Sequence, residues 1–209
     1  MELEELLLRR LAGHRLLKAA ERLSTARALC GVQAQFMSNA MHALRIRCTD
    51  WAAGGAGLVK NWSLRGTVHV FPESDLPLYI RAGDYRKNEW DAPNWWNSRP
   101  DWALSPERQR YFSQAVLEAL ENGPRTREEL RELCRAEGMT PEEEHSMFHP
   151  WGGGLRQLCE RGFMHYAAEE KKEFRPSPVF EPMPEDEARL ELARRYFRNY
   201  GPATVKDAE

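Results

Sequence analysis

Two stretches of the chain repeat one pattern, and this repeat limits the folds open to it. Residues 117–130 read LEALENGPRTREEL, and residues 196–209 read YFRNYGPATVKDAE. In each stretch a helical segment ends at Gly-Pro, and after one further residue a Thr begins a charged segment typical of a new helix. The two glycines, Gly123 and Gly201, are 78 residues apart. This spacing suits one small module with its connections, so the pattern predicts tandem modules of one kind.

The part of the chain before the first Gly-Pro predicts three helices followed by two strands. Leucines recur at helical spacing over residues 3–20, Ser24 can cap a helix that ends near Cys30, and a third helix is predicted over 38–47. From Lys60 to Phe71 the period changes to two, with Gly66 at the turn. Three helices and a hairpin are the order of a winged helix.

The part that follows repeats this order. Ser105 and Pro106 are a typical helix start, and two capping boxes begin at Thr126 and Thr140, each with a Glu three residues later. The predicted elements are a helix over 106–122, a helix from 126 to near 138, a helix start at 140, a short helix over 155–161, and a hairpin over 163–175.

The sequence therefore predicts a mainly α fold with short β-hairpins, organised as tandem winged helix-turn-helix modules. The predicted boundaries are residues 1–104 for the first module and 105–187 for the second. Residues 188–209 are expected to be the start of a third, incomplete module. Within the first module, residues 90–102 (WDAPNWWNSRPDW) hold four of the seven tryptophans. They are either an ordered loop packed on the module or a contact surface.

Composition sets broad limits on the class of protein. Charged residues make up 30% and hydrophobic residues 42%, and no run of eighteen apolar residues occurs. The N-terminus lacks the basic start of a secretory signal, so we expect a cytoplasmic protein and no membrane partner. The four cysteines, none in a CxxC pair, are predicted to be buried free thiols.

The net charge of −2 does not by itself indicate nucleic-acid binding, but charge is distributed unevenly. Residues 1–115 hold 16 Lys and Arg against 12 Asp and Glu, whereas residues 116–209 hold 14 against 20. If a polyanion binds, the first half is the expected surface.

Three stretches resemble the AlkZ/YcaQ family of winged-helix DNA glycosylases. Residues 31–35 (GVQAQ) are similar to the Gln-x-Gln motif of that family, and residues 64–70 (LRGTVHV) are similar to its RGTxH segment. Residues 200–204 (YGPAT) look like the start of its third module. Members of the family continue through a complete third winged helix and a β-rich region, and the Trp-rich segment is not expected from the family.

The resemblance implies a DNA repair glycosylase that hydrolyses the N-glycosidic bond of alkylated bases, either N7-alkylpurines or crosslinked ones. It implies Gln33 and Gln35 as catalytic residues, Arg65, Thr67 and His69 as DNA or pocket contacts, and double-stranded DNA as the partner. No cofactor is expected. Because glutamines two apart diverge on a helix but share a side in an extended chain, the catalytic interpretation requires a non-helical segment at residues 31–35.

Plainer interpretations stand beside these. The two glutamines could be solvated side chains on a loop, and Arg65, Thr67 and His69 could bond within the module to hold the hairpin. The alternative function is a non-catalytic winged-helix DNA-binding protein. His145 and His149 have a spacing that could bind zinc, but no third ligand is visible in the sequence, and we predict no metal site.

Overall fold

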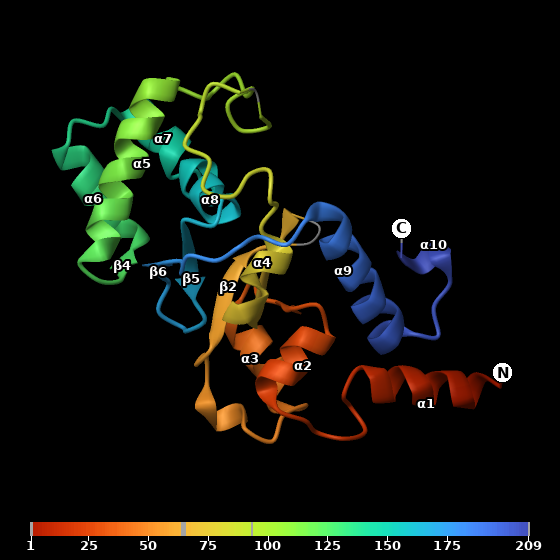
Figure 1. The fold of residues 1–209 in the computed structure, drawn as a ribbon. Coiled ribbons are helices and arrows are strands. Elements are labelled where there is room, and N and C mark those ends of the chain that lie inside the picture. Colours follow the sequence, from red (N-terminus) through yellow and green to blue (C-terminus); the bar gives the residue numbers. More distant parts are fainter. Residues whose placement is uncertain (1, 64–65, 93, 209) are drawn as a thin grey trace. The chain divides into compact units, whose positions relative to one another are not determined.

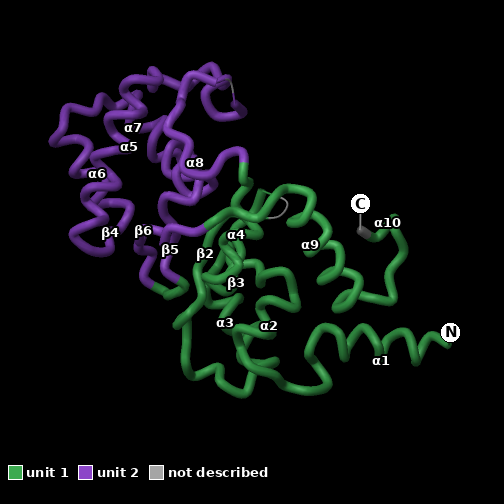
Figure 2. The backbone as a smooth tube through the Cα atoms, viewed as in Figure 1, with its two compact units in different colours: residues 1–82, 168–170, 181–209 green, residues 83–167, 171–180 purple. Residues whose placement is uncertain are grey.

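The computed structural model describes residues 2–63, 66–92 and 94–208, which form helices and short antiparallel strands (Figure 1). Contacts divide the chain into two compact units (Figure 2). Unit 1 holds residues 1–82, 168–170 and 181–209, and unit 2 holds residues 83–167 and 171–180. The units interleave along the chain, whereas the predicted modules follow one another. The predicted module boundaries stay a prediction.

Unit 1 is built around a three-stranded antiparallel arrangement in which β3 lies between β1 and β2. The hairpin predicted over 60–71 is confirmed by β2 and β3, whereas β1 is too short to give a periodic signal. The elements of unit 1 are α1 (Leu3–Gly13), α2 (Arg22–Ala28), β1 (Val32–Gln33), α3 (Met37–Arg45), a 3-10 helix (Trp51–Ala53), β2 (Leu58–Trp62), β3 (Val68–Pro72), a 3-10 helix (Glu73–Asp75), α4 (Leu76–Tyr79), α9 (Glu185–Tyr200) and α10 (Val205–Ala208).

The first predicted helix is shorter than its leucine pattern indicated. Helix α1 ends at Gly13, because the chain turns at His14 and Arg15 has a positive φ of 60°. None of its residues is buried. It lies beside α9, where the Gly13 backbone approaches Asn199 too closely for any side chain. The leucine repeat thus predicted the helix but not its end.

The core of unit 1 lies between α2, α3 and one face of the strands. The strands contribute Val32, Leu58 and Val70 to this core, and β3 is buried along its whole length, so both of its faces are covered. The buried residues of this core are Ala26, Leu29, Val32, Ala34, Met37, Ala40, Leu44, Cys48, Leu58, Val70 and Ala168.

Unit 2 has the same strand order, with β6 between β4 and β5 and all pairs antiparallel. In both units a helix, a short strand, further helical segments and a hairpin follow one another, which is the winged-helix order. The predicted fold class is confirmed. The elements of unit 2 are α5 (Pro106–Glu121), β4 (Arg125–Thr126), α6 (Arg127–Ala136), α7 (Pro141–Met147), α8 (Gly153–Glu160), β5 (Met164–Ala167) and β6 (Glu173–Pro176).

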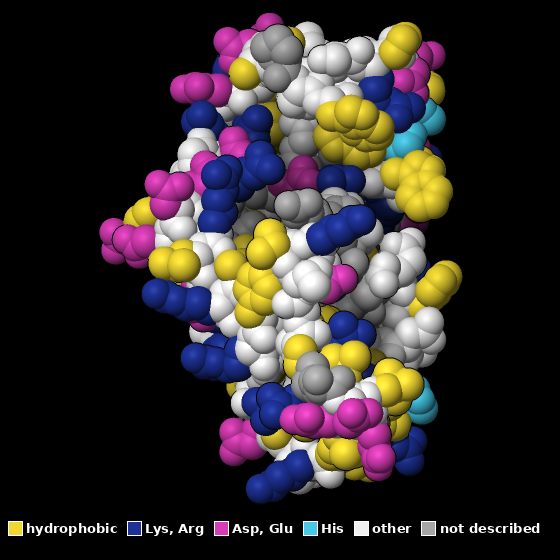
Figure 3. All heavy atoms as spheres, turned by 90° about the vertical axis from the view of Figure 1, so that its right-hand side faces the viewer, with side chains coloured by type: hydrophobic (Ala, Val, Ile, Leu, Met, Phe, Trp, Pro, Cys, Tyr) yellow, Lys and Arg dark blue, Asp and Glu magenta, His cyan; other side chains and the backbone are white. Residues whose placement is uncertain are grey.

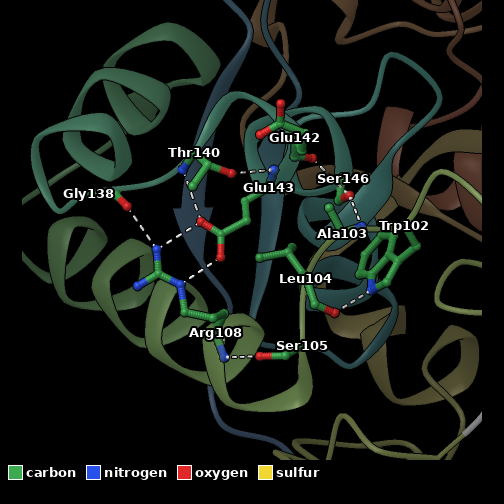
Figure 4. A network of polar contacts seen from close by, with 10 residues as sticks. All are labelled: Trp102, Ala103, Leu104, Ser105, Arg108, Gly138, Thr140, Glu142, Glu143 and Ser146. Carbon is green, nitrogen blue, oxygen red and sulfur yellow. Dashed lines mark hydrogen bonds and ion pairs between the residues drawn. The ribbon is translucent and has the colours of Figure 1, made fainter.

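The helix starts of unit 2 follow the capping signals of the sequence. Ser105 accepts a hydrogen bond from the Arg108 amide, and Thr126 and Thr140 each form a reciprocal capping box. Figure 4 shows how the second box is held: Glu143 accepts two bonds from Arg108, at 2.6 and 2.8 Å, while also bonding the Thr140 amide. The ion pair thereby fixes α7 against the start of α5.

The Gly-Pro-x-Thr repeat of the sequence also has a structural counterpart. At the start of α10, the Asp207 amide donates to the Thr204 hydroxyl and Asp207 accepts from the Thr204 amide, as Glu129 and Thr126 do in unit 2. Among the residues that the structure describes, no helix is long and apolar enough to cross a membrane.

Candidate catalytic site

The segment that carries the glutamine pair begins where α2 ends. The Cys30 amide donates to the Arg27 carbonyl at 3.1 Å, and the Gly31 amide donates to the Ala26 carbonyl at 2.8 Å. These are the two bonds of a Schellman motif, which places Cys30 in the left-handed position with φ of 52°. Glycine is usual there, because a side chain costs conformational energy in this region.

Gly31 then brings the chain onto strand β3. It has φ of +87°, and a Cβ at this position would lie 3.1 Å from the Cβ of His69. Glycine is therefore required twice here, for its backbone conformation and for its close approach. The chain continues as β1, which pairs Val32 with Val70 and Gln33 with His69, and the Ala34 amide donates to the Val68 carbonyl at 2.9 Å.

The two glutamines lie on an extended segment and point to one side of it. Val32 and Ala34 are buried, whereas Gln33 and Gln35 between and after them are exposed. This alternation is that of an extended chain, so the required non-helical geometry is confirmed. Neither glutamine side chain hydrogen-bonds to the part of the chain that the structure describes. Two carboxamides, each with donors and an acceptor, are thus presented side by side.

A polar row crosses the strands behind Gln33. In the antiparallel register, Gln33 lies opposite His69, and His69 lies opposite Asn61 on β2. Residues directly opposite one another share a face of the sheet. The row is exposed at Gln33, on the outermost strand, and buried at His69 and Asn61. Asn61 was not among the predicted site residues, although its place opposite a polar residue in the hairpin was a signal.

Within the hairpin, His69 bonds to its own strand pair. Its Nδ1 lies 2.9 Å from the Ser63 hydroxyl oxygen and 3.3 Å from the Thr67 carbonyl oxygen. The Thr67 hydroxyl is buried and has no hydrogen-bond partner among the described residues. Arg65 lies outside the described residues. His69 thus has a bond that holds the hairpin, whereas the Thr67 hydroxyl is enclosed by the protein.

A buried carboxylate ties the elements around the glutamine segment together. Asp75 accepts from Arg195 of α9 at 2.6 Å and from Arg27 of α2 at 3.2 Å. The Tyr200 hydroxyl donates to the Leu29 carbonyl at 2.8 Å. These contacts hold the end of α2 against α9. Burial also raises the pKa of the nearby Cys30 thiol to about 11, so that thiol stays protonated near neutral pH.

The hollow lined by α1 and α9 lies away from the glutamines. It measures about 450 Å³ and is lined by Leu7, Leu11, Tyr196 and their neighbours. Its lining includes neither Gln33 nor Gln35, so it is not part of the candidate catalytic site.

Unit 2 places a third potential metal ligand beside His145 and His149, where the sequence predicted no metal site. Ligand atoms of Asp101, His145 and His149 lie within 4.8 Å of one another. However, Asp101 accepts two bonds from Arg99, at 2.9 and 2.8 Å, and His149 Nδ1 accepts the Trp151 amide at 3.2 Å. A cation would compete with both sets of bonds.

The fold and its first strand define the class: a winged-helix protein that presents a pair of glutamines at the edge of one sheet. A family model described as DNA glycosylase AlkZ-like matches residues 26–209, and the chain belongs to this family.

Two comparisons with individual proteins agree with that membership. An interstrand DNA cross-link repair glycosylase of Streptomyces sahachiroi is 26% identical over 193 residues, which cover 85% of this chain and 51% of the relative. The solved structure of Streptomyces sahachiroi DNA glycosylase AlkZ matches with a TM-score of 0.71 at 23% identity, over 99% of this chain and 59% of that chain. The chain spans about half the length of the curated relative, and the structural likeness concerns the fold.

Proposed function

We propose that this protein binds double-stranded DNA and acts as a repair glycosylase, hydrolysing the N-glycosidic bond of N7-alkylated or crosslinked purines. The observation that carries the proposal is the exposed pair Gln33 and Gln35, presented on one side of an extended segment at the sheet edge. Membership of the DNA glycosylase AlkZ-like family supports the reaction class.

The chemistry suits a pair of neutral dipoles. In the hydrolysis, the bond between the base nitrogen and C1′ breaks, the base keeps the bonding electrons, and water adds to C1′ and loses a proton. Positive charge develops on the sugar as the bond breaks. An N7-alkylated purine is already cationic and leaves readily, so no strong acid is needed. A glutamine oxygen can accept from the water or face the cation, and its nitrogen can donate to a neighbouring oxygen.

The remaining predicted contacts take supporting roles in this proposal. His69 sits opposite Gln33 and would hold that strand pair in register. Thr67 would line the pocket, as the family resemblance implies. Arg65 would contact a phosphate, as the family resemblance implies.

The alternative is a DNA-binding protein without catalysis. It is favoured by one observation: both glutamines are exposed, and the hollow lined by α1 and α9 includes neither of them. Winged-helix binding alone would then explain the fold, with the glutamines as DNA contacts.

The test is single-turnover release of 7-methylguanine from alkylated duplex DNA by the wild type, Gln33→Ala and Gln35→Ala. Removal of one oriented dipole should slow release by roughly 10²-fold or more. Both side chains are exposed, so the free energy of unfolding should change by less than about 1 kcal/mol, and circular dichroism should be unchanged.

Release by both variants at the wild-type rate would exclude a catalytic role for the pair. DNA binding without base release by the wild type would make the non-catalytic alternative the better description.

A further inference from the structure

Unit 2 exposes two tryptophans that its own core does not need. Of the aromatic side chains in the Trp-rich segment, Trp90 and Trp96 are buried, but Trp95 is 66% exposed. Trp151, which precedes α8, is 70% exposed. Single exposed apolar side chains are ordinary, but two exposed tryptophans that contact the same inner aromatic pair indicate a binding surface.

Both exposed tryptophans contact an inner aromatic pair, of which Trp96 is buried and His149 is partly buried. Trp95 packs edge-on against Trp96, with ring centroids 4.5 Å apart, and Trp96 lies 5.3 Å from the ring of His149. The Trp151 amide donates to His149 Nδ1. Figure 3 shows bulky hydrophobic side chains beside His and Lys or Arg side chains in the upper right part of the face drawn there. We call Trp95, Trp96, His149 and Trp151 the indole cluster.

Arginines accompany the indole cluster. The Arg99 guanidinium lies 5.3 Å from the Trp95 ring and 5.8 Å from the Trp96 ring, and the Arg156 guanidinium lies 5.8 Å from the Trp96 ring. Asp101 fixes Arg99 with two bonds, and Glu160 fixes Arg156 at 2.8 Å. Trp95 stays mostly exposed despite its contact with Arg99, so part of its ring surface is open to a ligand.

Open indole surfaces with fixed guanidinium groups beside them suit one ligand chemistry in particular. Unpaired nucleotides offer a flat base that stacks on an indole and a phosphate that attracts an arginine. Paired bases in a duplex hide their faces from such contacts. A glycosylase that reaches a base inside the duplex must open the stack, which leaves nucleotides unpaired.

We propose that the indole cluster binds unpaired nucleotides of DNA, with Trp95 and Trp151 stacking on bases and Arg99 and Arg156 facing phosphates. This inference rests on the proposed function in so far as DNA is the ligand. It assigns the Trp-rich segment, which the family resemblance did not explain, to DNA contact and not to catalysis.

The test measures the affinity of the full chain for a labelled single-stranded dT12 and for a duplex of the same length. Trp95→Ala and Trp151→Ala should each weaken single-strand binding by roughly 5- to 150-fold, the range for loss of one stacked base. They should weaken duplex binding less. Trp95→Phe and Trp151→Phe keep a ring and should restore most of the single-strand affinity.

The matched control is Tyr111→Ala. Tyr111 is an exposed aromatic residue of the same unit, 46% exposed, but its hydroxyl donates to Glu137 and it lies outside the indole cluster. Its removal should leave single-strand affinity unchanged. Circular dichroism of each variant checks that unit 2 stays folded.

Several outcomes would overturn the inference. These are wild-type affinity in both Trp→Ala variants, no binding of dT12 by the wild type, or an equal loss with Tyr111→Ala. Binding to phosphatidylserine vesicles that depends on both tryptophans, without an effect on DNA, would assign the cluster to a lipid surface instead. The proposed function fails separately, when Gln33→Ala and Gln35→Ala release base at the wild-type rate, because that result leaves the dT12 affinities untouched.

Discussion

The two units build the same strand order but use the start of that order differently. In unit 2, β4 runs directly into α6, and its last residue, Thr126, caps the helix by accepting from the Glu129 amide. In unit 1, β1 is followed by Ala34, Gln35 and Phe36 before α3 begins, and Phe36 at the N-cap gives no side-chain bond. In unit 2 the last residue of the short strand stabilises the helix that follows. In unit 1 the last residue of the short strand, Gln33, is exposed to solvent.

This difference shows where local rules are broken for another purpose. A Ser, Thr, Asp or Asn at the N-cap stabilises a helix by about 1 kcal/mol, and unit 2 has such caps on α5, α6 and α7. Unit 1 lacks one next to the glutamine pair. Departures from local consistency are expected at functional sites. However, α1, α2 and α9 of unit 1 also lack a side-chain cap, so the open start of α3 marks the glutamine segment only if a variant there changes base release.

The hairpins of the two units also differ in how a shared histidine–serine contact is used. His69 lies 2.9 Å from the Ser63 hydroxyl, and His165 lies 3.1 Å from the Ser177 hydroxyl. His69 stands opposite the exposed Gln33, whereas His165 stands opposite Arg175. If the His165–Ser177 contact is only structural, the titration of His165 should change the free energy of unfolding.

The largest expected effect is a pH dependence of stability from His165. Burial and the charge of Arg175 lower its pKa to about 4. An unfolded histidine takes up its proton near pH 6.5. Between these two pH values the unfolded chain binds more protons than the folded chain. The free energy of unfolding is therefore highest above about pH 6.5 and falls as the pH drops towards 4. The loss should be roughly 3 kcal/mol.

Urea unfolding at pH 7, 5.5 and 4 measures this. His165→Asn keeps a polar group near Ser177 but cannot titrate, so its stability should fall less across that range than that of the wild type. Burial also lowers the pKa of His14 and His149, and those groups add to the slope in both proteins. Parallel losses in the wild type and the variant would show that His165 does not carry the effect.

The second prediction concerns the turn into β1. Gly31→Ala should destabilise the protein by about 1–2 kcal/mol through its left-handed backbone, and further because the new Cβ would lie 3.1 Å from His69. Gly138→Ala is the matched control, since Gly138 has φ of +79° after α6 and no atom within 4 Å of an added Cβ. The loss of stability in Gly138→Ala therefore measures the backbone strain alone.

Unfolding in urea gives both values. A larger loss for Gly31→Ala than for Gly138→Ala, together with slower base release, would show that the close packing on His69 positions the glutamines. Equal losses would mean that the contact with His69 adds nothing to the strain.

Much of the fold could be predicted because its signals are local. The capping boxes at Thr126 and Thr140 and the helix start at Ser105 each need only three or four neighbouring residues, and all three are confirmed. The burial of all four cysteines is also confirmed. The two-residue strands β1 and β4 were missed, because a pattern of period two needs more residues than they have.

The candidate site depended on contacts that a sequence does not display. The alternation at residues 31–35 was recognisable, but the pairing of Gln33 with His69 joins residues 36 positions apart. The buried Asp75 draws its two arginines from α2 and α9, which no local pattern connects. Cys30 takes the left-handed conformation that glycine usually takes at a helix end. The sequence showed a glycine only at Gly31, so the special conformation of Cys30 could not be predicted.

The smallest effect tests the missing cap. Phe36 is 67% exposed and has the extended backbone that an N-cap residue needs, with φ of −112° and ψ of 122°. A serine there can accept from the Asn39 amide, so Phe36→Ser should be more stable than Phe36→Ala by about 1 kcal/mol. The alanine variant removes the same ring without offering an acceptor, and the difference between the two isolates the cap. Thr126→Ala in unit 2 should lose a similar amount of stability.

If Phe36→Ser gains stability and base release slows relative to Phe36→Ala, the open helix start serves the glutamine segment. If release is equal in both, the absence of a cap in unit 1 is unrelated to catalysis, and the contrast between the units is one of stability alone.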